Sequence, residues 1–391
     1  MFGKRWRLFR LFGISINVDP SWLLIFFLVA WTVGGLFAKV APDLTPGSAW
    51  GLGLFTALAF FACIVLHELG HSLVARRTGI PVENITLFLF GGVAEIGGEP
   101  PSPGKEFGMA IAGPVVSAVL AAVFWGLSVA GAQQGWPVVL RLVCEYLAYI
   151  NVAVLLFNMV PAFPLDGGRV LRAALWAGTG SLRKATRWAS RGGQAFAWLL
   201  IVWGLFQTFS GYGAGVGGLW LVLIGFFLNA AARQSYRQVV VRQALEGVPV
   251  SRLMKADAVT VPPTLSLTEW VEQYVYRQQQ RAYPVVWDGV LKGVITTADL
   301  SAYPRDEWDL RTVGEAMHRD VRAVTIAPDA GALQALEQMQ RTGSGRLLVA
   351  EDGQLRGVIG LEELARFLDL KQELEGDAVP WTGPRGQHAA R

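Results

Sequence analysis

The spacing of hydrophobic residues divides the chain into two parts. Before about residue 232 long apolar runs recur, whereas after it apolar and polar positions alternate over short distances. A run of roughly 20 apolar residues is long enough to cross a bilayer as a helix. Six segments are predicted to do so: residues 21–40, 52–74, 108–131, 138–160, 195–210 and 215–232. Residues 1–235 are therefore expected to form a polytopic α-helical membrane domain in contact with the lipid bilayer.

Composition agrees with this division. Hydrophobic residues make up 52% of the chain and charged residues 16%, which is outside the usual balance of a soluble domain. Basic residues flank the apolar segments instead of alternating with aromatic residues, so the net charge of +4 does not indicate a nucleic-acid partner. The two cysteines, Cys63 and Cys144, both lie in apolar segments, which excludes a disulfide framework.

Lys and Arg gather on one side of the predicted spans. They precede the first span, follow the second, separate the fourth from the fifth and follow the sixth, whereas loops 41–51 and 132–137 contain none. Cytoplasmic loops are enriched in these residues. We therefore expect a multi-pass protein of the cell membrane with both termini in the cytoplasm. The basic segment 1–10 is expected to precede a retained span, because no small-residue cleavage site follows it.

The second predicted span contains the sequence His67-Glu68-Leu69-Gly70-His71. On a helix His67 and His71 lie on one face, where both imidazoles can bind one zinc ion while Glu68 reaches a water on that ion. Ionisable groups at membrane depth cost several kcal/mol, about 3 for a carboxylate, so a packing role is not expected. The helix is apolar all round, which argues against a soluble zinc protease. His67 lies about 22 Å into the span, nearer its cytoplasmic end.

A catalytic zinc normally has three protein ligands and one open position. No further histidine is available in the membrane part, because His318 and His388 lie in the C-terminal part. Asp166 follows the fourth span, which runs in the same direction as the second, so its carboxylate is expected at the depth of His71. Two alternatives remain open: Asp166 could cap the helix that follows it, or Cys63, one turn before His67, could be the third ligand.

These features resemble the site-2 protease family of intramembrane zinc metalloproteases, over roughly residues 10–232. The resemblance rests on the HELGH helix, on Gly113-Pro114 and on a segment of the form N-x-x-P-x-x-x-L-D-G that begins at Asn158. It implies that Asp166 completes the zinc site, that Glu68 is general base and acid, and that Asn158 helps to hold the substrate backbone. Gly113-Pro114 matches only part of a family element, and no role is inferred for it.

A β-hairpin is predicted between the second and third spans. Residues 85–90 read as one strand, Gly91-Gly92 as the turn, and residues 93–96 as the return strand. The unpaired edge of the hairpin could accept an unwound substrate segment by strand addition, so Gly91 and Gly92 are assigned to substrate binding. Alternatively, the hairpin only closes the cytoplasmic mouth of the site. Glu95 is expected to be solvated, and the family resemblance implies a membrane-associated hairpin or sheet here.

After a linker at residues 236–249, two segments repeat with a period near 60 residues, 250–305 and 306–370. Each reads as strand, helix, strand, turn, strand, helix, and the pair resembles an α/β tandem CBS (Bateman) module. Such modules bind adenine nucleotides, which the resemblance places near Thr296 and Asp299; the second copy has Gly360 and Glu363 there. The alternative is a pair used only for homodimerisation or substrate docking. Residues 371–391 are expected to be a disordered tail.

Together these patterns favour an intramembrane zinc endopeptidase with one Zn²⁺ per chain. Its substrate would be a single-span or membrane-associated protein, cleaved within or beside the membrane, and the cytoplasmic CBS domains would regulate it. Zinc lowers the pKa of a bound water towards about 7, so Glu68 can take its proton and later protonate the leaving amine. A CBS-containing metal-ion transporter and an inactive membrane scaffold are the alternatives, although a transporter leaves Glu68 unexplained.

Overall fold

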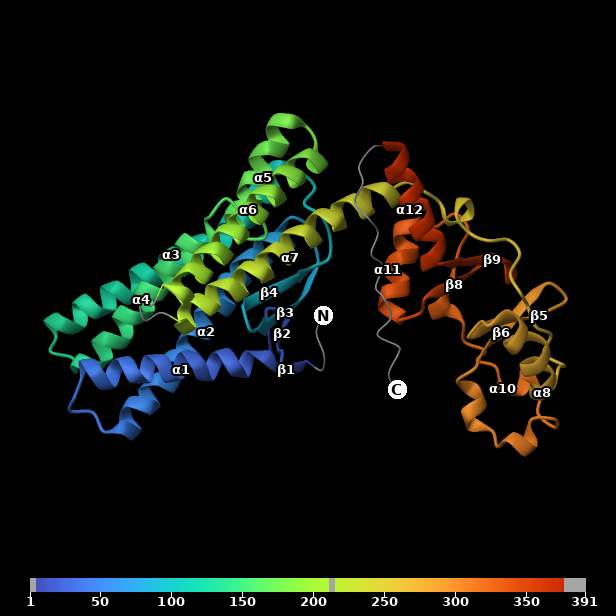
Figure 1. Ribbon diagram of the computed structural model, residues 1–391, viewed down its shortest axis with the longest axis horizontal. Helices are drawn as coiled ribbons and strands as arrows, with labels where there is room; N and C mark the ends of the chain where they lie inside the picture. Colours follow the sequence, from blue (N-terminus) through green and yellow to red (C-terminus); the bar gives the residue numbers. More distant parts are fainter. Residues whose placement is uncertain (1–4, 211–214, 376–391) are drawn as a thin grey trace. The chain divides into compact units, whose positions relative to one another are not determined.

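The computed structural model describes residues 5–210 and 215–375. The chain forms two compact units, Met1–Tyr236 and Arg237–Arg391. The first is built from long helices and a small sheet, and the second from a five-stranded sheet with short helices (Figure 1).

Four helices in the described part of the chain are long and apolar enough to cross a membrane. They coincide with the first four predicted spans and are α1 (Ser21–Val40), α2 (Pro46–Arg77), α3 (Pro103–Gln133) and α4 (Val138–Asn158). The fifth and sixth predicted spans overlap α6 (Leu182–Phe209) and α7 (Gly215–Leu245). Each of these helices is apolar over one half and basic over the other, so their crossing of the membrane stays a prediction. A shorter helix, α5 (Asp166–Thr179), precedes α6.

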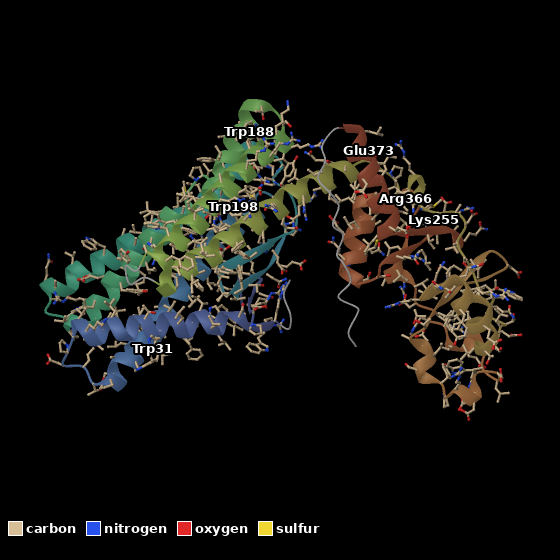
Figure 2. The ribbon with its side chains drawn as sticks, viewed as in Figure 1. Trp31, Trp188, Trp198, Lys255, Arg366 and Glu373 are labelled. Carbon is tan, nitrogen blue, oxygen red and sulfur yellow. The ribbon has the colours of Figure 1, made fainter. Side chains whose placement is uncertain are left out.

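Large apolar side chains point outward from these helices. Trp31 on α1 is 65% exposed and Trp198 on α6 is 51% exposed (Figure 2). A soluble surface rarely carries many such side chains together, whereas a surface covered by lipid does. The outward face of the first unit therefore agrees with a membrane protein.

A four-stranded sheet lies in the same unit, in the order β1 (Trp6–Leu11), β2 (Ile14–Val18), β3 (Val82–Phe88) and β4 (Gly91–Ile96). The β2 and β3 strands are parallel, and the other neighbours are antiparallel. Sequence reasoning did not predict β1 and β2, although Ile14, Ile16 and Val18 alternate with polar residues as a half-buried strand requires.

The predicted hairpin is present as β3–β4, but its predicted turn is wrong by two residues. Phe88 pairs with Gly91 and Leu87 with Gly92, so the turn consists of Leu89 and Phe90 and both glycines belong to β4. Gly91 has a φ of +129°, a conformation that only glycine adopts without strain, which explains its place at the start of the strand.

The second unit contains two repeats joined edge to edge in one sheet, ordered β5-β6-β9-β8-β7. The first repeat contains β5 (Ala282–Trp287), β6 (Val290–Thr296), and a helical segment formed by α8 (Leu267–Trp270), a π-helical turn (Val271–Val275) and α9 (Tyr276–Gln278). Helix α10 (Val313–Ala316) opens the second repeat but packs on the core of the first. The second contains β7 (Thr325–Ile326), α11 (Ala332–Thr342), β8 (Arg346–Glu351), β9 (Gln354–Gly360) and α12 (Leu361–Glu375). Short 3₁₀ turns occupy Val250–Arg252, Asp299–Ala302, Arg305–Glu307 and Arg322–Val324.

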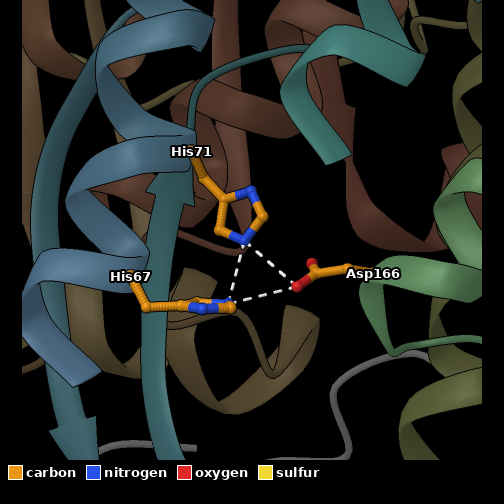
Figure 3. A group of neighbouring side chains, drawn as sticks. All are labelled: His67, His71 and Asp166. Atoms are coloured by element: carbon orange, nitrogen blue, oxygen red, sulfur yellow. Dashed lines mark hydrogen bonds and ion pairs between the residues drawn. The ribbon is translucent and has the colours of Figure 1, made fainter. Parts of the chain in front are cut away.

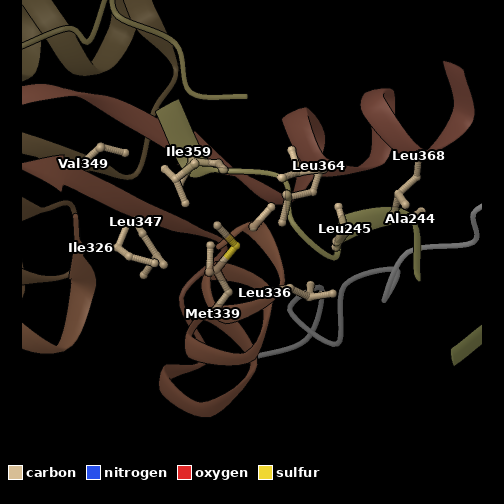
Figure 4. Close-up of a cluster of buried hydrophobic side chains, with 14 residues drawn as sticks. Ala244, Leu245, Ile326, Leu336, Met339, Leu347, Val349, Ile359, Leu364 and Leu368 are labelled. Carbon is tan, nitrogen blue, oxygen red and sulfur yellow. The ribbon is translucent and has the colours of Figure 1, made fainter. Parts of the chain in front are cut away.

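The core of the second repeat includes the end of α7. Leu245 is fully buried in a cluster with Leu336, Leu347 and Ile359 (Figure 4). The range 236–249, expected to be a linker, is thus helical up to Leu245 and supplies core residues. Residues 371–375 continue α12, and the rest of the predicted disordered tail, 376–391, lies outside the described residues.

The close packing of α1 on α2 yields a first prediction. A Cβ on Gly53 would lie 2.5 Å from the carbonyl oxygen of Ala30, whereas a Cβ on Gly51 would have nothing within 4 Å. Alanine is about 1 kcal/mol better than glycine in an open helix position. We expect Gly51→Ala to keep or raise the melting temperature in detergent and Gly53→Ala to lower it by several degrees. Equal melting temperatures would contradict this packing.

Candidate metal centre

The predicted ligands His67, His71 and Asp166 come together as one cluster (Figure 3). His67 and His71 lie on the buried face of α2, with exposed fractions of 3% and 4%. The oxygen Oδ2 of Asp166 lies 3.2 Å from Nε2 of His67 and 3.2 Å from Nε2 of His71, and the two Nε2 atoms are themselves 3.2 Å apart. The three atoms therefore form a nearly equilateral triangle.

This triangle fits a tetrahedral zinc ion. With bonds of about 2.0–2.1 Å, two ligand atoms of a tetrahedral zinc lie roughly 3.3 Å apart. Two imidazole nitrogens and one carboxylate oxygen are also donor types that zinc accepts, and three protein ligands leave a fourth position open. The donor set and its spacing are thus those of a catalytic zinc site.

Helix α3 sets the orientation of both imidazoles. Nδ1 of His71 donates to the carbonyl oxygen of Met109 at 2.7 Å, and Nδ1 of His67 lies 2.9 Å from the hydroxyl of Ser117. When Nδ1 carries the proton, Nε2 presents its lone pair to a metal. Sequence reasoning missed both partners, since a backbone carbonyl has no sequence signature and Ser117 alone is an ordinary helix residue.

The same helix leaves room for the imidazoles at Gly113. A Cβ at this position would overlap Nε2 of His71 and would lie 2.6 Å from Nε2 of His67. The sequence assigned no role to Gly113-Pro114, and the structure gives Gly113 one: any side chain there would displace the imidazoles. Nearby, a Cβ on Gly70 would lie 2.8 Å from Val116, so α2 and α3 also pack closely beside the motif.

The two alternatives to the Asp166 interpretation find no support in the geometry. Asp166 is the first residue of α5, and Leu165 occupies the cap position without a side-chain capping bond, so the Asp166 carboxylate faces the imidazoles instead of capping the helix. Cys63 is buried on α2 but does not belong to the cluster. The segment before Asp166 packs closely on the start of α5, since a Cβ on Gly168 would lie 2.5 Å from the carbonyl carbon of Ala162.

Glu68 lies against β4. A Cβ on Gly92 would stand 2.7 Å from Cγ and 3.4 Å from Oε1 of Glu68, so glycine leaves the space in which this carboxylate sits. Gly91 has open space around it. Asn158 ends α4, is half-buried, and its side chain has no hydrogen-bond partner among the described residues. The structure therefore brings Gly92 to Glu68 and leaves the Asn158 amide free.

Contacts at both ends hold the hairpin in place. At its turn, the amide of Leu89 donates to Oγ of Ser21 at 3.2 Å, and the ring of Phe90 stacks on Phe227 of α7 with centroids 4.4 Å apart. At its other end, the side chain of Glu95 is 39% exposed, as expected of a solvated residue, and it also accepts from Asn84 at 2.9 Å and pairs with Arg5. Glu95 is therefore a structural residue of the sheet.

A buried ion pair connects α5 to α3. Nε of Arg172 donates to Oε1 of Glu106 at 2.6 Å, Glu99 lies 3.6 Å from the same guanidinium, and both Glu106 and Arg172 are buried. Removing one partner of a buried pair typically costs about 3–5 kcal/mol, because the other charge is left uncompensated. The pair thus fixes the helix that carries Asp166 to the helix that orients the histidines. Sequence reasoning counted Arg172 only as one of the basic residues between spans.

In the second unit, Thr296 and Asp299 also meet. The amide and hydroxyl of Thr296 donate to Oδ2 of Asp299 at 2.7 and 2.9 Å, and Nε2 of His318 lies 2.7 Å from Oδ1. The second repeat has a different arrangement, in which Lys255 pairs with Glu363 at 2.7 Å. Burial raises the pKa of Glu363, but the hydrogen bond and charge of Lys255 together with backbone hydrogen bonds outweigh this and hold the pKa below its usual value.

Comparisons with known proteins agree with this geometry. Residues 55–135 and 131–200 match the model of Peptidase family M50, and residues 250–306 and 313–370 each match that of the CBS domain. The "Putative zinc metalloprotease sll0528" of Synechocystis sp. is 38% identical over 368 residues, which cover 94% of this chain and 95% of that protein. The "Zinc metalloprotease MJ0392" of Methanocaldococcus jannaschii is 29% identical over 378 residues, covering 94% and 98%.

Among solved structures, the site-2 protease from Methanocaldococcus jannaschii is 30% identical, with a TM-score of 0.42, and the match covers 60% of this chain and 96% of that one. The chain belongs to peptidase family M50, the site-2 proteases, and carries a tandem pair of CBS domains. It is a zinc metalloprotease, which confirms the class predicted from the HELGH helix and the segment around Asp166.

The position of Gly113 yields a second prediction. Gly113→Ala places a methyl group among the imidazoles, and we expect the zinc affinity to fall at least about tenfold, as it does when metal ligands lose their orientation. Gly108→Ala on the same helix is the control, because a Cβ there has nothing within 4 Å. Zinc per chain is measured by mass spectrometry after dialysis against a chelator. Equal zinc retention in both variants would contradict the role of Gly113.

Proposed function

We propose that the protein is an intramembrane zinc endopeptidase that hydrolyses a peptide bond in a transmembrane or membrane-adjacent segment of a substrate protein. The observation that carries this proposal is that Asp166 lies 3.2 Å from His67 and His71, which share with Glu68 a helix apolar enough to span a membrane. The names of the relatives support the hydrolytic chemistry.

Each residue of the site has a separate role in the reaction. Zinc bound by the two imidazoles and Asp166 would supply a Lewis acid that polarises the scissile carbonyl and makes water a better nucleophile at neutral pH. Glu68 takes a proton from the attacking water and delivers it to the leaving nitrogen as the C–N bond breaks. Met109 and Ser117 keep the imidazoles in the tautomer that binds metal.

Strand β4 presents the substrate to these groups. It is last in the order of its sheet, so its outer edge has no strand partner among the described residues. An unwound substrate segment can add to this edge through backbone hydrogen bonds. Gly91 has open space for that segment, Gly92 lies against Glu68, and the free amide of Asn158 binds the backbone of the segment. In the alternative role, the hairpin only closes the mouth of the site.

The orientation of the protein follows from its basic residues. Arg76 and Arg77 end α2. Because cytoplasmic loops are enriched in Arg and Lys, the C-terminal end of α2 faces the cytoplasm. Substrate and water then reach the metal centre from the cytoplasmic side. Both termini and the CBS domains are cytoplasmic, and the protein crosses the membrane several times.

Glu68→Gln tests the catalytic proposal. The amide keeps the shape of the side chain but cannot take up a proton, so we expect cleavage to fall by about 10²–10⁴-fold while zinc is retained. The variant also serves to trap membrane partners, which mass spectrometry identifies. A trapped partner is then used as the substrate of the cleavage assay in liposomes. Glu83→Gln, an exposed glutamate on β3, is the control and should cleave normally.

Each alternative function predicts a different result. If the Glu68→Gln protein moves zinc across liposomes as fast as the wild type, the protein is a transporter. If the wild type retains zinc and cleaves no trapped partner, it is a scaffold. Unchanged cleavage by Glu68→Gln would remove Glu68 from the mechanism.

We further propose that the CBS pair binds an adenine nucleotide beside Thr296 and Asp299 and regulates the protease, with the pair also forming a homodimer contact. Nucleotide binding can change activity only if it favours one of two conformations. Gly360 lacks the hydroxyl that Thr296 supplies, so one nucleotide per chain is expected.

Thr296→Val tests the nucleotide site. Loss of the hydroxyl removes one hydrogen bond to a charged group, so we expect the affinity for ATP or AMP to fall about tenfold. Isothermal titration of the full-length protein in detergent gives the affinity and the stoichiometry. Thr342→Val, at an exposed position of α11, should leave both unchanged. Two nucleotides per chain, or equal affinity in both variants, would refute the assignment.

A further inference from the structure

Exposed aromatic and aliphatic side chains surround the β1–β2 hairpin. Trp6, Leu8 and Phe9 of β1 are 50–55% exposed, and Phe12 in the turn is 64% exposed. A bulge between Arg7 and Phe9 breaks the alternation of the strand, so β1 is exposed along nearly its whole length. Soluble proteins rarely leave a long hydrophobic edge strand uncovered, because it aggregates.

Four arginines border this apolar surface. Arg7 and Arg10 belong to β1, and Arg76 and Arg77 end α2; all four are exposed. Arg76 donates to the carbonyl of Phe12, which joins the end of α2 to the hairpin turn. None of the four forms an ion pair with a described carboxylate. The nearby carboxylate of Glu95 pairs with Arg5. We call this surface the N-terminal patch: Trp6, Leu8, Phe9 and Phe12 with the four arginines.

The patch lies where two membrane helices end. Strand β2 stops at Val18 and α1 begins at Ser21, while α2 ends at Arg77 beside the same hairpin. Asp19 closes the short connection, since its carboxylate accepts from the amide of Ser21 at 2.9 Å and its own amide donates to Leu87. The N-terminal patch is therefore held at the level where α1 and α2 leave the hydrocarbon.

We propose that the N-terminal patch binds anionic phospholipid headgroups of the leaflet at this end of α1 and α2. The arginines contact lipid phosphates, and the rings of Trp6, Phe9 and Phe12 insert between headgroups and acyl chains. Aromatic residues favour this layer because one part of it is apolar and the other is wet. Unpaired arginines favour anionic over zwitterionic lipid, since only the former gives a negative surface potential.

The test uses the full-length protein in nanodiscs. A fluorophore is attached at Leu8→Cys after Cys63 and Cys144 are replaced by alanine, and lipid contact is read from quenching by spin-labelled lipid. Discs contain phosphatidylcholine alone or with about one third phosphatidylglycerol. We expect at least about twofold stronger quenching with the anionic lipid, an excess that high salt removes. A label at Leu310→Cys, 81% exposed in the second unit, is the control.

Arg7→Gln, Arg10→Gln and Arg77→Gln combined should abolish the excess quenching by anionic lipid and reduce the phosphatidylglycerol that copurifies with the protein at least about twofold. Arg76 is kept, because it holds the turn. An unchanged melting temperature and zinc content show that the variant is folded. Equal quenching in both lipids, or an excess that survives the triple substitution, would overturn the proposal. The assay needs no substrate, so its outcome is independent of the proposed proteolysis.

Discussion

The structure of the metal centre depends on one helix that supplies no ligand. Three donor atoms with lone pairs repel one another at 3.2 Å. They keep this spacing because α3 fixes the side chains and the helix that carry them. Met109 and Ser117 hold the imidazoles, while Glu106 holds α5 through Arg172. A metal ion then meets donors that are already arranged, so little conformational freedom is lost on binding.

Close backbone approach is the second requirement of this region. Gly113 admits the imidazoles, Gly92 admits Glu68, and Gly53 lets α1 approach α2. In a membrane, helices gain little from the hydrophobic effect when they associate, so small residues that permit close packing contribute much of the stability. The same residue type thus serves helix association and the shape of the site.

The strongest parts of the site could be predicted from sequence because they follow helix periodicity. His67 and His71 recur after four residues, and Asp166 follows from the need for a third ligand. The hairpin turn was displaced by two residues because glycines normally mark turns, whereas here Gly91 and Gly92 serve the strand. Met109 acts through its backbone, and Arg172 meets Glu106 only after folding, so neither function has a local signal.

Fold prediction failed where segments were short. The β1 and β2 strands have six and five residues and stand beside a membrane span, so their period of two was overlooked. Helices α6 and α7 each join an apolar half to a basic half, so the fifth and sixth spans stay predictions.

Helix α7 belongs to both units, and this limits how the protein can be dissected. Phe227 stacks on the hairpin turn, and eighteen positions later Leu245 fills the centre of the second CBS core. A CBS fragment that starts after Leu245 would lack this side chain and lose about 2–5 kcal/mol of stability, by analogy with deletion of a buried leucine side chain. Expression boundaries for the CBS unit therefore belong upstream of Ala244, within α7.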